Sequence, residues 1–203
     1  TKPAKLSKEE KEMANFAQQH INLTTFYQLS LKTDLRQQLM HHSRWKKPVL
    51  IIPTLASEYT DPENRPVFEN IIYELKRARY LAKIIIGVDK ASREDIELLR
   101  QILTEKGSSN YFIQWNDGPG FSNIYKKLEE MGLDLSTPGK GRNLFMSFGV
   151  ALALGATSVG LLDADIKSFK KVQLDRLFYP VVVLNYEFSK AFYARWDGTR
   201  MYG

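Results

Sequence analysis

The stretch Lys83-Ile84-Ile85-Ile86-Gly87-Val88 decides the fold of this chain. Its unbroken apolar run is typical of a parallel β-strand that is buried on both faces. The run Val49-Leu50-Ile51-Ile52, which ends in Pro53, has the same character, and residues 111–115 and 158–162 are predicted as two further strands. Because helical patterns separate these runs, we predict an α/β fold in which a mostly parallel sheet is flanked by helices.

Helices are predicted wherever apolar residues recur at helical spacing between the strands. Ser92 with Asp95 three residues later resembles a capping box and marks one helix start. A loop that runs through Gly141 is expected before the last of these helices. The predicted ranges are 69–81, 93–104, 121–131 and 143–154.

The chain is predicted to have two parts, an N-terminal helical extension over residues 1–46 and the α/β domain over residues 47–203. Residues 7–44 carry apolar positions at helical spacing among many Gln, Lys and Glu, which predicts one or two helices. We expect the extension to pack on its own domain, with docking to a partner subunit as the alternative. His41 and His42 have no carboxylate or cysteine at ligand spacing, so a solvated or capping role is expected.

Composition limits the function classes. The 203 residues are 43% hydrophobic, which suffices for a core, and the net charge of +6 favours phosphorylated partners but is too small to indicate nucleic acid. The absence of cysteine excludes disulfides and thiolate metal sites. The first residues lack the apolar core of a signal peptide, and the apolar run 149–162 is too short for a membrane span. We therefore expect a cytoplasmic protein.

Polar residues follow the ends of several predicted strands. Ser57 and Glu58 lie just beyond the first strand, Asp89 follows the second, and Asp163 and Asp165 follow the last. In a parallel α/β sheet the ligand site lies outside the carboxyl ends of the strands. We therefore expect these side chains to line one rim.

The triplet Asp163-Ala164-Asp165 is a candidate cation site. Residues two apart on an extended segment project to the same side, so both carboxylates can face one ligand while Ala164 points away. Carboxylates together with a diphosphate suit Mg²⁺ or Mn²⁺. The alternative is that the two carboxylates cap a helix or stabilise a turn; the position at a sheet rim favours the cation site.

The segment Gly139-Lys140-Gly141 is a candidate phosphate-binding loop. Glycine lets the backbone approach a ligand, Lys140 supplies charge, and the following helix adds its positive end. A flexible surface turn is the alternative. The spacing is not that of a Walker A loop or of GxGxxG, which disfavours P-loop kinases and dinucleotide dehydrogenases. Residues 54–60 contain no glycine, which disfavours a nucleotidyltransferase.

Six segments in this order resemble the glucosyl-3-phosphoglycerate synthases, and mannosylglycerate synthases are similar over the glycine-lysine and DAD segments. The resemblance runs from Val49 to Gly203. The segments are Pro53-Thr54-Leu55-Ala56-Ser57-Glu58, Gly87-Val88-Asp89-Lys90-Ala91-Ser92, Trp115-Asn116-Asp117-Gly118-Pro119, Pro138-Gly139-Lys140-Gly141-Arg142-Asn143, Asp163-Ala164-Asp165-Ile166 and residues 185–195.

The resemblance implies a GT-A glycosyltransferase. Such an enzyme takes a UDP-, GDP- or ADP-glucose donor and a Mg²⁺ or Mn²⁺ ion, and transfers the sugar to 3-phosphoglycerate or glycerate with retention of configuration. The product would be a precursor of the compatible solute glucosylglycerate, and a homodimer is expected. A mannosylglycerate synthase-like transferase and a non-catalytic nucleotide-sugar-binding domain remain as alternatives.

The resemblance also implies roles for individual residues. Base and ribose contacts fall on Pro53, Leu55, Ser57, Glu58 and Asp89. By the same likeness, Lys140 contacts the nucleotide, Asp163 and Ala164 face the donor, and Asp165 is the metal ligand. Arg195 is expected to face the acceptor, which makes Asp163, Asp165 and Arg195 the candidate catalytic residues.

Three departures from the family pattern stand out. Ser57 occupies a position that is usually acidic, and residues 179–185 form a shorter connection than expected. The chain stops at Gly203, where family members continue into a Gly-Arg-Val-Thr segment that grips the acceptor phosphate and later supply a histidine metal ligand. We therefore expect a donor half without a complete acceptor half.

Overall fold

The computed structural model describes residues 35–107, 110–135, 137–191, 195–196, 199 and 201–202. The helices predicted over residues 7–34 lie outside these described residues, and the boundary at residue 46 stays a prediction. In chain order the elements are α2 (Leu35–His42), β1 (Pro48–Leu55), α3 (Ser57–Thr60), α4 (Arg65–Leu75), β2 (Lys83–Asp89), α5 (Arg93–Lys106), β3 (Tyr111–Trp115), α6 (Pro119–Glu130), α7 (Lys140–Ala153), β4 (Ser158–Leu161), α8 (Lys171–Val182), β5 (Arg195–Trp196) and β6 (Met201–Tyr202).

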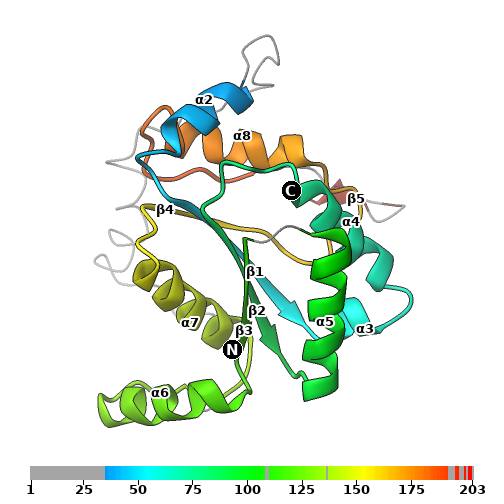
Figure 1. Cartoon of the computed structure of the whole chain (residues 1–203), viewed down its shortest axis with the longest axis vertical. Coiled ribbons are helices and arrows are strands. Elements are labelled where there is room, and N and C mark those ends of the chain that lie inside the picture. The colour runs from blue at the N-terminus through cyan, green and yellow to red at the C-terminus, as the bar shows by residue number, and fades with distance from the viewer. Residues whose placement is uncertain are drawn as a thin grey trace, which may run out of the picture. The chain divides into compact units, whose positions relative to one another are not determined.

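The centre of the domain is a four-stranded parallel sheet in the order β3-β2-β1-β4 (Figure 1). A separate antiparallel pair joins β5 to β6. Strand β1 lies between β2 and β4, and both β1 and β2 are buried along almost their whole length. The predicted α/β class with a parallel sheet is confirmed, and the arrangement is consistent with a GT-A glycosyltransferase.

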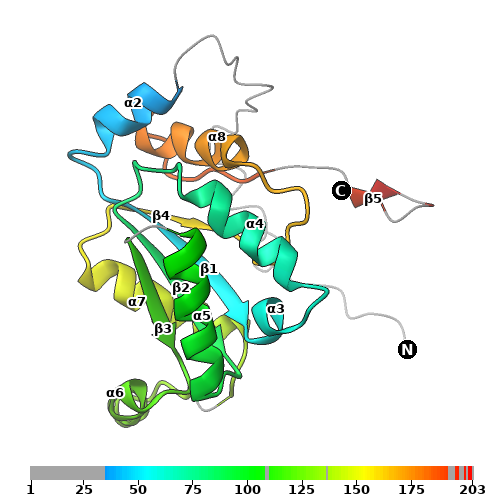
Figure 2. The same ribbon diagram turned by 45° about the vertical axis from the view of Figure 1, so that its right-hand side comes forward.

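Helices cover both faces of the sheet (Figures 1 and 2). On one face α7 packs against β1 and β2, where Val49, Ile51 and Ile85 form a buried cluster with Ala151. The opposite face is covered by α4 and α5, which contact each other. Because side chains alternate along a strand, Leu50 and Ile52 point to that second layer.

Strand β1 continues through Pro53 to Leu55, whereas the sequence pattern ended it at Pro53. Proline has no N–H to donate to a ladder, so a central strand normally excludes it. Here the Leu162 N–H bonds the Ile51 carbonyl, and the β1–β4 register ends at Ile51 and Leu161. The nitrogen of Pro53 thus faces the side on which the ladder has already ended.

The remaining strand predictions are close to the observed bounds, and the helices shift more. Helix α4 begins at Arg65 rather than at residue 69, with Pro66 in its first turn, where a missing N–H costs nothing. Helix α7 begins at Lys140, so the loop predicted to run through Gly141 ends one residue before the lysine. The capping box of Ser92 and Asp95 is confirmed at the start of α5.

Helix α8 was not predicted from the sequence, because Pro180 and the valines after it are unfavourable in a helix and the helical spacing of apolar residues was not recognised. Leu174, Phe178 and Val182 recur every four residues and are all buried. Phe178 packs on β4 so closely that a Cβ added to Gly160 would lie 2.5 Å from its ring. The glycine is therefore required for the helix to lie on the strand.

Helix α2 packs on α8, as expected for this part of the N-terminal extension. Leu35 and Leu39 are buried, and the Tyr179 hydroxyl donates to the Gln38 side-chain carbonyl at 2.7 Å. Within the described residues, no helix is long and apolar enough to cross a membrane.

Candidate functional site

Polar groups from the strand ends and from α7 meet at the rim where the parallel strands end. Figure 1 shows α3 and the first turn of α7 at this end of the sheet. The rim is the place where the sequence predicted a ligand site, and the contacts below show which of the predicted residues lie together there.

Lys140 and Asp163 form an ion pair across the rim. The Lys140 Nζ lies 2.6 Å from the Asp163 Oδ1, and the two side chains are 63% and 48% exposed. Lys140 opens α7, and Asp163 follows β4. The glycine-lysine loop and the DAD triplet, which are 23 residues apart in sequence, therefore face one another, and because both groups stay open to solvent, an anionic ligand can reach the lysine.

The glycines on either side of Lys140 leave open space. Among the described residues, no atom lies within 4 Å of a Cβ built on Gly139 or Gly141. Packing of the protein therefore does not explain these glycines, whereas close approach of a ligand to the backbone would. The N-terminus of α7 lies here as well, and no side chain caps it through Gly139. Its free N–H groups favour an anion.

Arg142, in the same first turn, is held under the rim. Its Nη2 donates to the Asp89 Oδ1 at 3.0 Å and to the Asp117 Oδ1 at 2.8 Å. The Arg142 and Asp89 side chains are only 8% and 4% exposed. The Arg142 guanidinium also lies over the Tyr125 ring, 5.3 Å from its centroid. One arginine thus ties the start of α7 to the ends of β2 and β3.

Asn143 makes the second attachment. Its Nδ2 donates to the Gly87 carbonyl at 2.7 Å and to the Asp89 Oδ2 at 2.8 Å. A Cβ on Gly87 would lie 2.1 Å from the Asn143 Oδ1, so the asparagine fits only because residue 87 is glycine. Together, Asn143 and Arg142 occupy both oxygens of Asp89.

Glu58 and Asp165 bring negative charge to the same rim. Burial raises the pKa of the Glu58 carboxyl, and the charge of Asp165 raises it further. Asp163 and Asp165 are exposed while Ala164 is 5% exposed, as predicted for residues that alternate in direction. A cation bound here would reduce the repulsion between these carboxylates.

The residues present fit a cation that is held by one or two carboxylates and mainly by the phosphates of a bound nucleotide. Among the described residues there is no cluster of three or more His, Cys, Asp or Glu side chains that could hold a metal. Mg²⁺ is commonly bound through one or two carboxylates with waters and substrate phosphates. The exposed Asp165, two residues from Asp163, fits that mode, and a role for Mg²⁺ or Mn²⁺ stays a prediction.

The other predicted site residues on β1 and α3 lie at the same rim, whereas Arg195 belongs to the separate β5–β6 pair. Pro53 is half-buried, Leu55 is 40% exposed, and Ser57 and Glu58 open the short helix α3. Arg195 begins β5, and its side chain lies outside the described residues. The binding roles of all these residues stay predictions, as does the contact of Asp89 with base or ribose, although the observed partners of Asp89 are protein groups.

Sequence reasoning missed Arg142, Asn143 and Asp117 as site residues. The quoted motifs contained all three, but only the fold shows that the ends of β2 and β3 and the start of α7 meet. The signal in the sequence was Gly87 inside an otherwise bulky strand, because an interior glycine marks close approach of another group.

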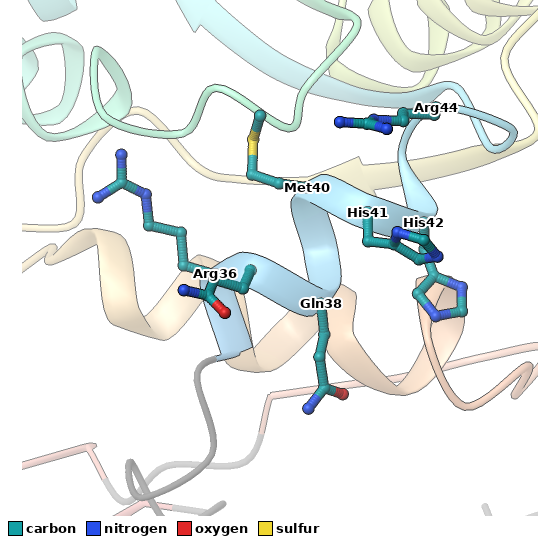
Figure 3. Close-up of a pocket in the computed structure, with 7 residues that line it drawn as sticks. Arg36, Gln38, Met40, His41, His42 and Arg44 are labelled. Carbon is teal, nitrogen blue, oxygen red and sulfur yellow. The ribbon is translucent and has the colours of Figure 1, made fainter.

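A second hollow lies along α2, away from the rim (Figure 3). It has a volume of about 690 Å³, and its described lining residues all fall between Arg36 and Arg44. Figure 3 shows His41 and His42 side by side on this segment; their rings are 5.4 Å apart. Its described lining residues include arginines and histidines but no carboxylate, whereas the rim brings a lysine and carboxylates together, so the rim is the better candidate.

Two curated proteins are similar to this chain over most of its length. A glucosyl-3-phosphoglycerate synthase of Persephonella marina is 38% identical over 188 residues, which cover 90% of this chain and 45% of that protein. One of Methanococcoides burtonii is 28% identical over 199 residues, or 93% of this chain and 46% of the relative. The resemblance is confirmed. No family model matches the chain, and no solved structure does.

The chain spans about 45% of the length of these curated relatives. The aligned stretches extend over almost the whole chain. Both relatives carry names that imply a glycosyltransferase.

Proposed function

We propose that this chain carries the nucleotide-sugar site of a retaining transferase that moves glucose from a nucleotide-diphosphate glucose to 3-phosphoglycerate. The observation that carries the proposal is the Lys140–Asp163 pair at the open rim, in a chain that is 38% identical to a synthase of that name. A coupled cation and carboxylate beside a helix N-terminus is a suitable setting for a diphosphate.

In this proposal, Lys140 exchanges its contact with Asp163 for the donor diphosphate. Both side chains are about half exposed or more, so the ion pair is weak in water and easily replaced. Lysine acts on phosphate as a mobile point charge, and the glycines beside it let the diphosphate approach the backbone. Asp163 is then released to face the ribose or the sugar.

A cation bound at Asp165 would neutralise charge on the departing nucleotide diphosphate. Retention of configuration needs no separate protein base, since the leaving diphosphate can accept the acceptor proton. The residues of the rim therefore act by positioning and electrostatic stabilisation. The predicted role of Arg195 is to face the acceptor's carboxylate or phosphate.

The test is turnover with defined substrates. The chain is incubated with UDP-, GDP- or ADP-glucose, Mg²⁺ or Mn²⁺ and 3-phosphoglycerate, and glucosyl-3-phosphoglycerate is measured by mass spectrometry. We expect product with at least one donor, and its loss in Asp165→Ala. The matched control is Glu97→Ala, which removes an exposed carboxylate that pairs with Arg100 on the surface of α5.

Parallel incubations replace 3-phosphoglycerate with glycerate, or glucose donors with GDP-mannose. Product only with GDP-mannose would indicate the mannosylglycerate synthase-like alternative. No product from any pair, with no nucleotide binding in equilibrium dialysis, would refute the proposal.

The second candidate function is nucleotide-sugar binding without transfer. The observation that favours it is that the described contacts of the rim, Lys140 with Asp163 at the start of α7, suit the donor diphosphate, whereas the side chain of Arg195, predicted to face the acceptor, lies outside the described residues. Cation-dependent nucleotide binding in the absence of product would indicate this candidate, because the rim would then bind the donor while the acceptor was not engaged.

A further inference from the structure

We propose that Arg142 is a positioning residue that holds Lys140 at the rim, with Asp89 and Asp117 as its anchors. This inference deepens the proposed function and rests on it for the role of Lys140 toward the nucleotide. It assigns Arg142 a part in donor binding although its own side chain is buried.

Apart from Asn143, which bonds Gly87 and Asp89, the first turn of α7 has few other means of attachment. Gly139 offers no side-chain cap, and neither Gly139 nor Gly141 has a Cβ to pack. Lys140 itself is 63% exposed. The turn is therefore held in place by the residues that follow Gly141, which contact the ends of the strands.

Arg142 supplies that attachment through two carboxylates. Its Nη2 bonds both Asp89 at the end of β2 and Asp117 after β3, and the buried setting strengthens these bonds relative to surface ion pairs. The backbone N–H of Lys90 donates to the second oxygen of Asp117. The arginine therefore joins α7 to two strand ends at once.

The aromatic ring of Tyr125 completes the enclosure. It lies against the Arg142 guanidinium, and its hydroxyl donates to the Asn116 carbonyl at 3.1 Å. The side chain of Lys140 leaves the helix two residues before Arg142, so a shift of this turn displaces the ammonium group directly. Lysine in place of Arg142 lacks the planar guanidinium that lies over the Tyr125 ring.

The first experiment follows Lys140 without any ligand. Lysines are reductively methylated with ¹³C-formaldehyde, and the Lys140 resonance is assigned with Lys140→Arg. Asp163→Asn should shift this resonance in the native background, because the ion pair is lost, and the shift should disappear in Arg142→Met, because the lysine is no longer held near Asp163. A shift of unchanged size in Arg142→Met would overturn the proposal.

Arg142→Met leaves Asp89 buried without its cation, so it can unfold the chain. Asp117→Asn removes one anchor at the more exposed side, since Asp117 is 32% exposed, and should reduce the Asp163→Asn shift only in part. Arg100→Met is the matched control, because it removes an exposed arginine that pairs with Glu97. It should leave the Lys140 resonance unaltered.

The second experiment measures the affinity for UDP with Mn²⁺ by calorimetry. We expect about a tenfold loss in Arg142→Lys, comparable to the low end of what losing a supporting partner costs at metal sites. In a Lys140→Met background the same substitution should have almost no effect, because its influence passes through the lysine. Equal losses in both backgrounds would show a purely structural role and refute the proposal.

The two experiments separate the failure of this inference from that of the proposed function. If the native chain binds none of UDP, GDP and ADP, the proposed function fails, and the ¹³C measurement alone still decides whether Arg142 positions Lys140. The proposed function stands if nucleotide binds. The positioning role is refuted if, in both experiments, the effect of substituting Arg142 is independent of the second substitution, Asp163→Asn or Lys140→Met.

Discussion

At the scale of single residues, close packing makes Gly87 irreplaceable. The Cβ of Gly87→Ala would lie 2.1 Å from the Asn143 Oδ1, so either the asparagine or strand β2 must move. We expect the free energy of unfolding to fall by about 2–4 kcal/mol, through overpacking and the loss of two buried hydrogen bonds. Urea unfolding at 25 °C measures it.

Gly141→Ala is the matched comparison, because it adds the same methyl group where no described atom lies within 4 Å. Alanine is the better helix former, so stability should stay the same or rise by up to about 1 kcal/mol. UDP binding should weaken if the diphosphate approaches that backbone. A large loss of stability in Gly141→Ala would contradict the observed packing.

Two glutamates with opposite pKa shifts predict opposite pH dependence. Burial and Asp165 raise the pKa of Glu58, so its ionised form disfavours the folded state. Hydrogen bonding to Lys106 lowers the pKa of Glu69, despite partial burial. The contribution of Glu58 to stability is fully present below the pKa that its carboxyl has in the unfolded chain, and it is lost as the pH rises through the pKa in the folded chain. The contribution of Glu69 is present above the pKa that its carboxyl has in the unfolded chain, and it is lost as the pH falls through the pKa in the folded chain.

We therefore expect Glu58→Gln to be more stable than the native chain at pH 7 and Glu69→Gln to be less stable. Both differences should shrink as the pH falls toward about 4, near the ordinary pKa of glutamate. Denaturant unfolding at a series of pH values measures them. A Glu58→Gln effect that did not vary with pH would show that ionisation of Glu58 is not its cause.

The residue scale also shows where prediction from sequence ends for the site. Lys140, Asp163 and Asp165 could be identified because their residue types and spacing indicate phosphate and cation chemistry. The bridge from Arg142 to Asp89 and Asp117 spans 53 and 25 residues. No local pattern records which strand ends meet, so this bridge emerged only from the fold.

At the scale of elements, the strands were predicted well because burial on both faces leaves an unbroken apolar run. Strands β1 and β2 follow that signal. Their register and the two-residue strands β5 and β6 were not predicted. Helix ends were predicted less well, because caps and prolines shift them by several residues. Helix α8 was not predicted because Pro180 and its valines disfavour a helix on local propensity. The helix is stabilised by tertiary packing against β4, which the local sequence does not show.

Helix α6 is expected to be the least stable helix among those with three or more turns. None of its residues is buried, whereas α5 buries Ile96, Leu99, Ile102 and Leu103. Helical stability in proteins comes mainly from packing of an apolar face. Its amides should therefore exchange through local opening, at a free energy more than about 1.4 kcal/mol below that of α5.

Native-state hydrogen exchange followed by NMR measures both helices in one sample, so α5 is the internal control. Tyr125 should be the best-protected part of α6, since it is attached to Asn116 and Arg142. Equal protection across α5 and α6 would mean that another surface covers α6 in solution.

At the scale of the whole molecule, the proposed site should link stability to nucleotide and cation together. A ligand that binds only the folded chain at 100 times its dissociation constant raises the free energy of unfolding by about 2.7 kcal/mol. We expect UDP with Mn²⁺ to approach this value in thermal or urea unfolding. UDP with EDTA should give much less, because Lys140 alone would then oppose the charge of the diphosphate and the nearby carboxylates.

Substitutions of Asp165 and Lys140 should separate the part of the stabilisation that depends on the cation from the part that depends on the lysine. Asp165→Ala should abolish the difference between Mn²⁺ and EDTA, while Lys140→Met should weaken the stabilisation in both conditions. In the proposed site the cation and the lysine would bind the same diphosphate from different segments, the one after β4 and the start of α7. Glu97→Ala should preserve the full linkage. Stabilisation by UDP that was equal with and without Mn²⁺ in the native chain would remove the cation from the proposed site and leave nucleotide binding to Lys140 and the start of α7.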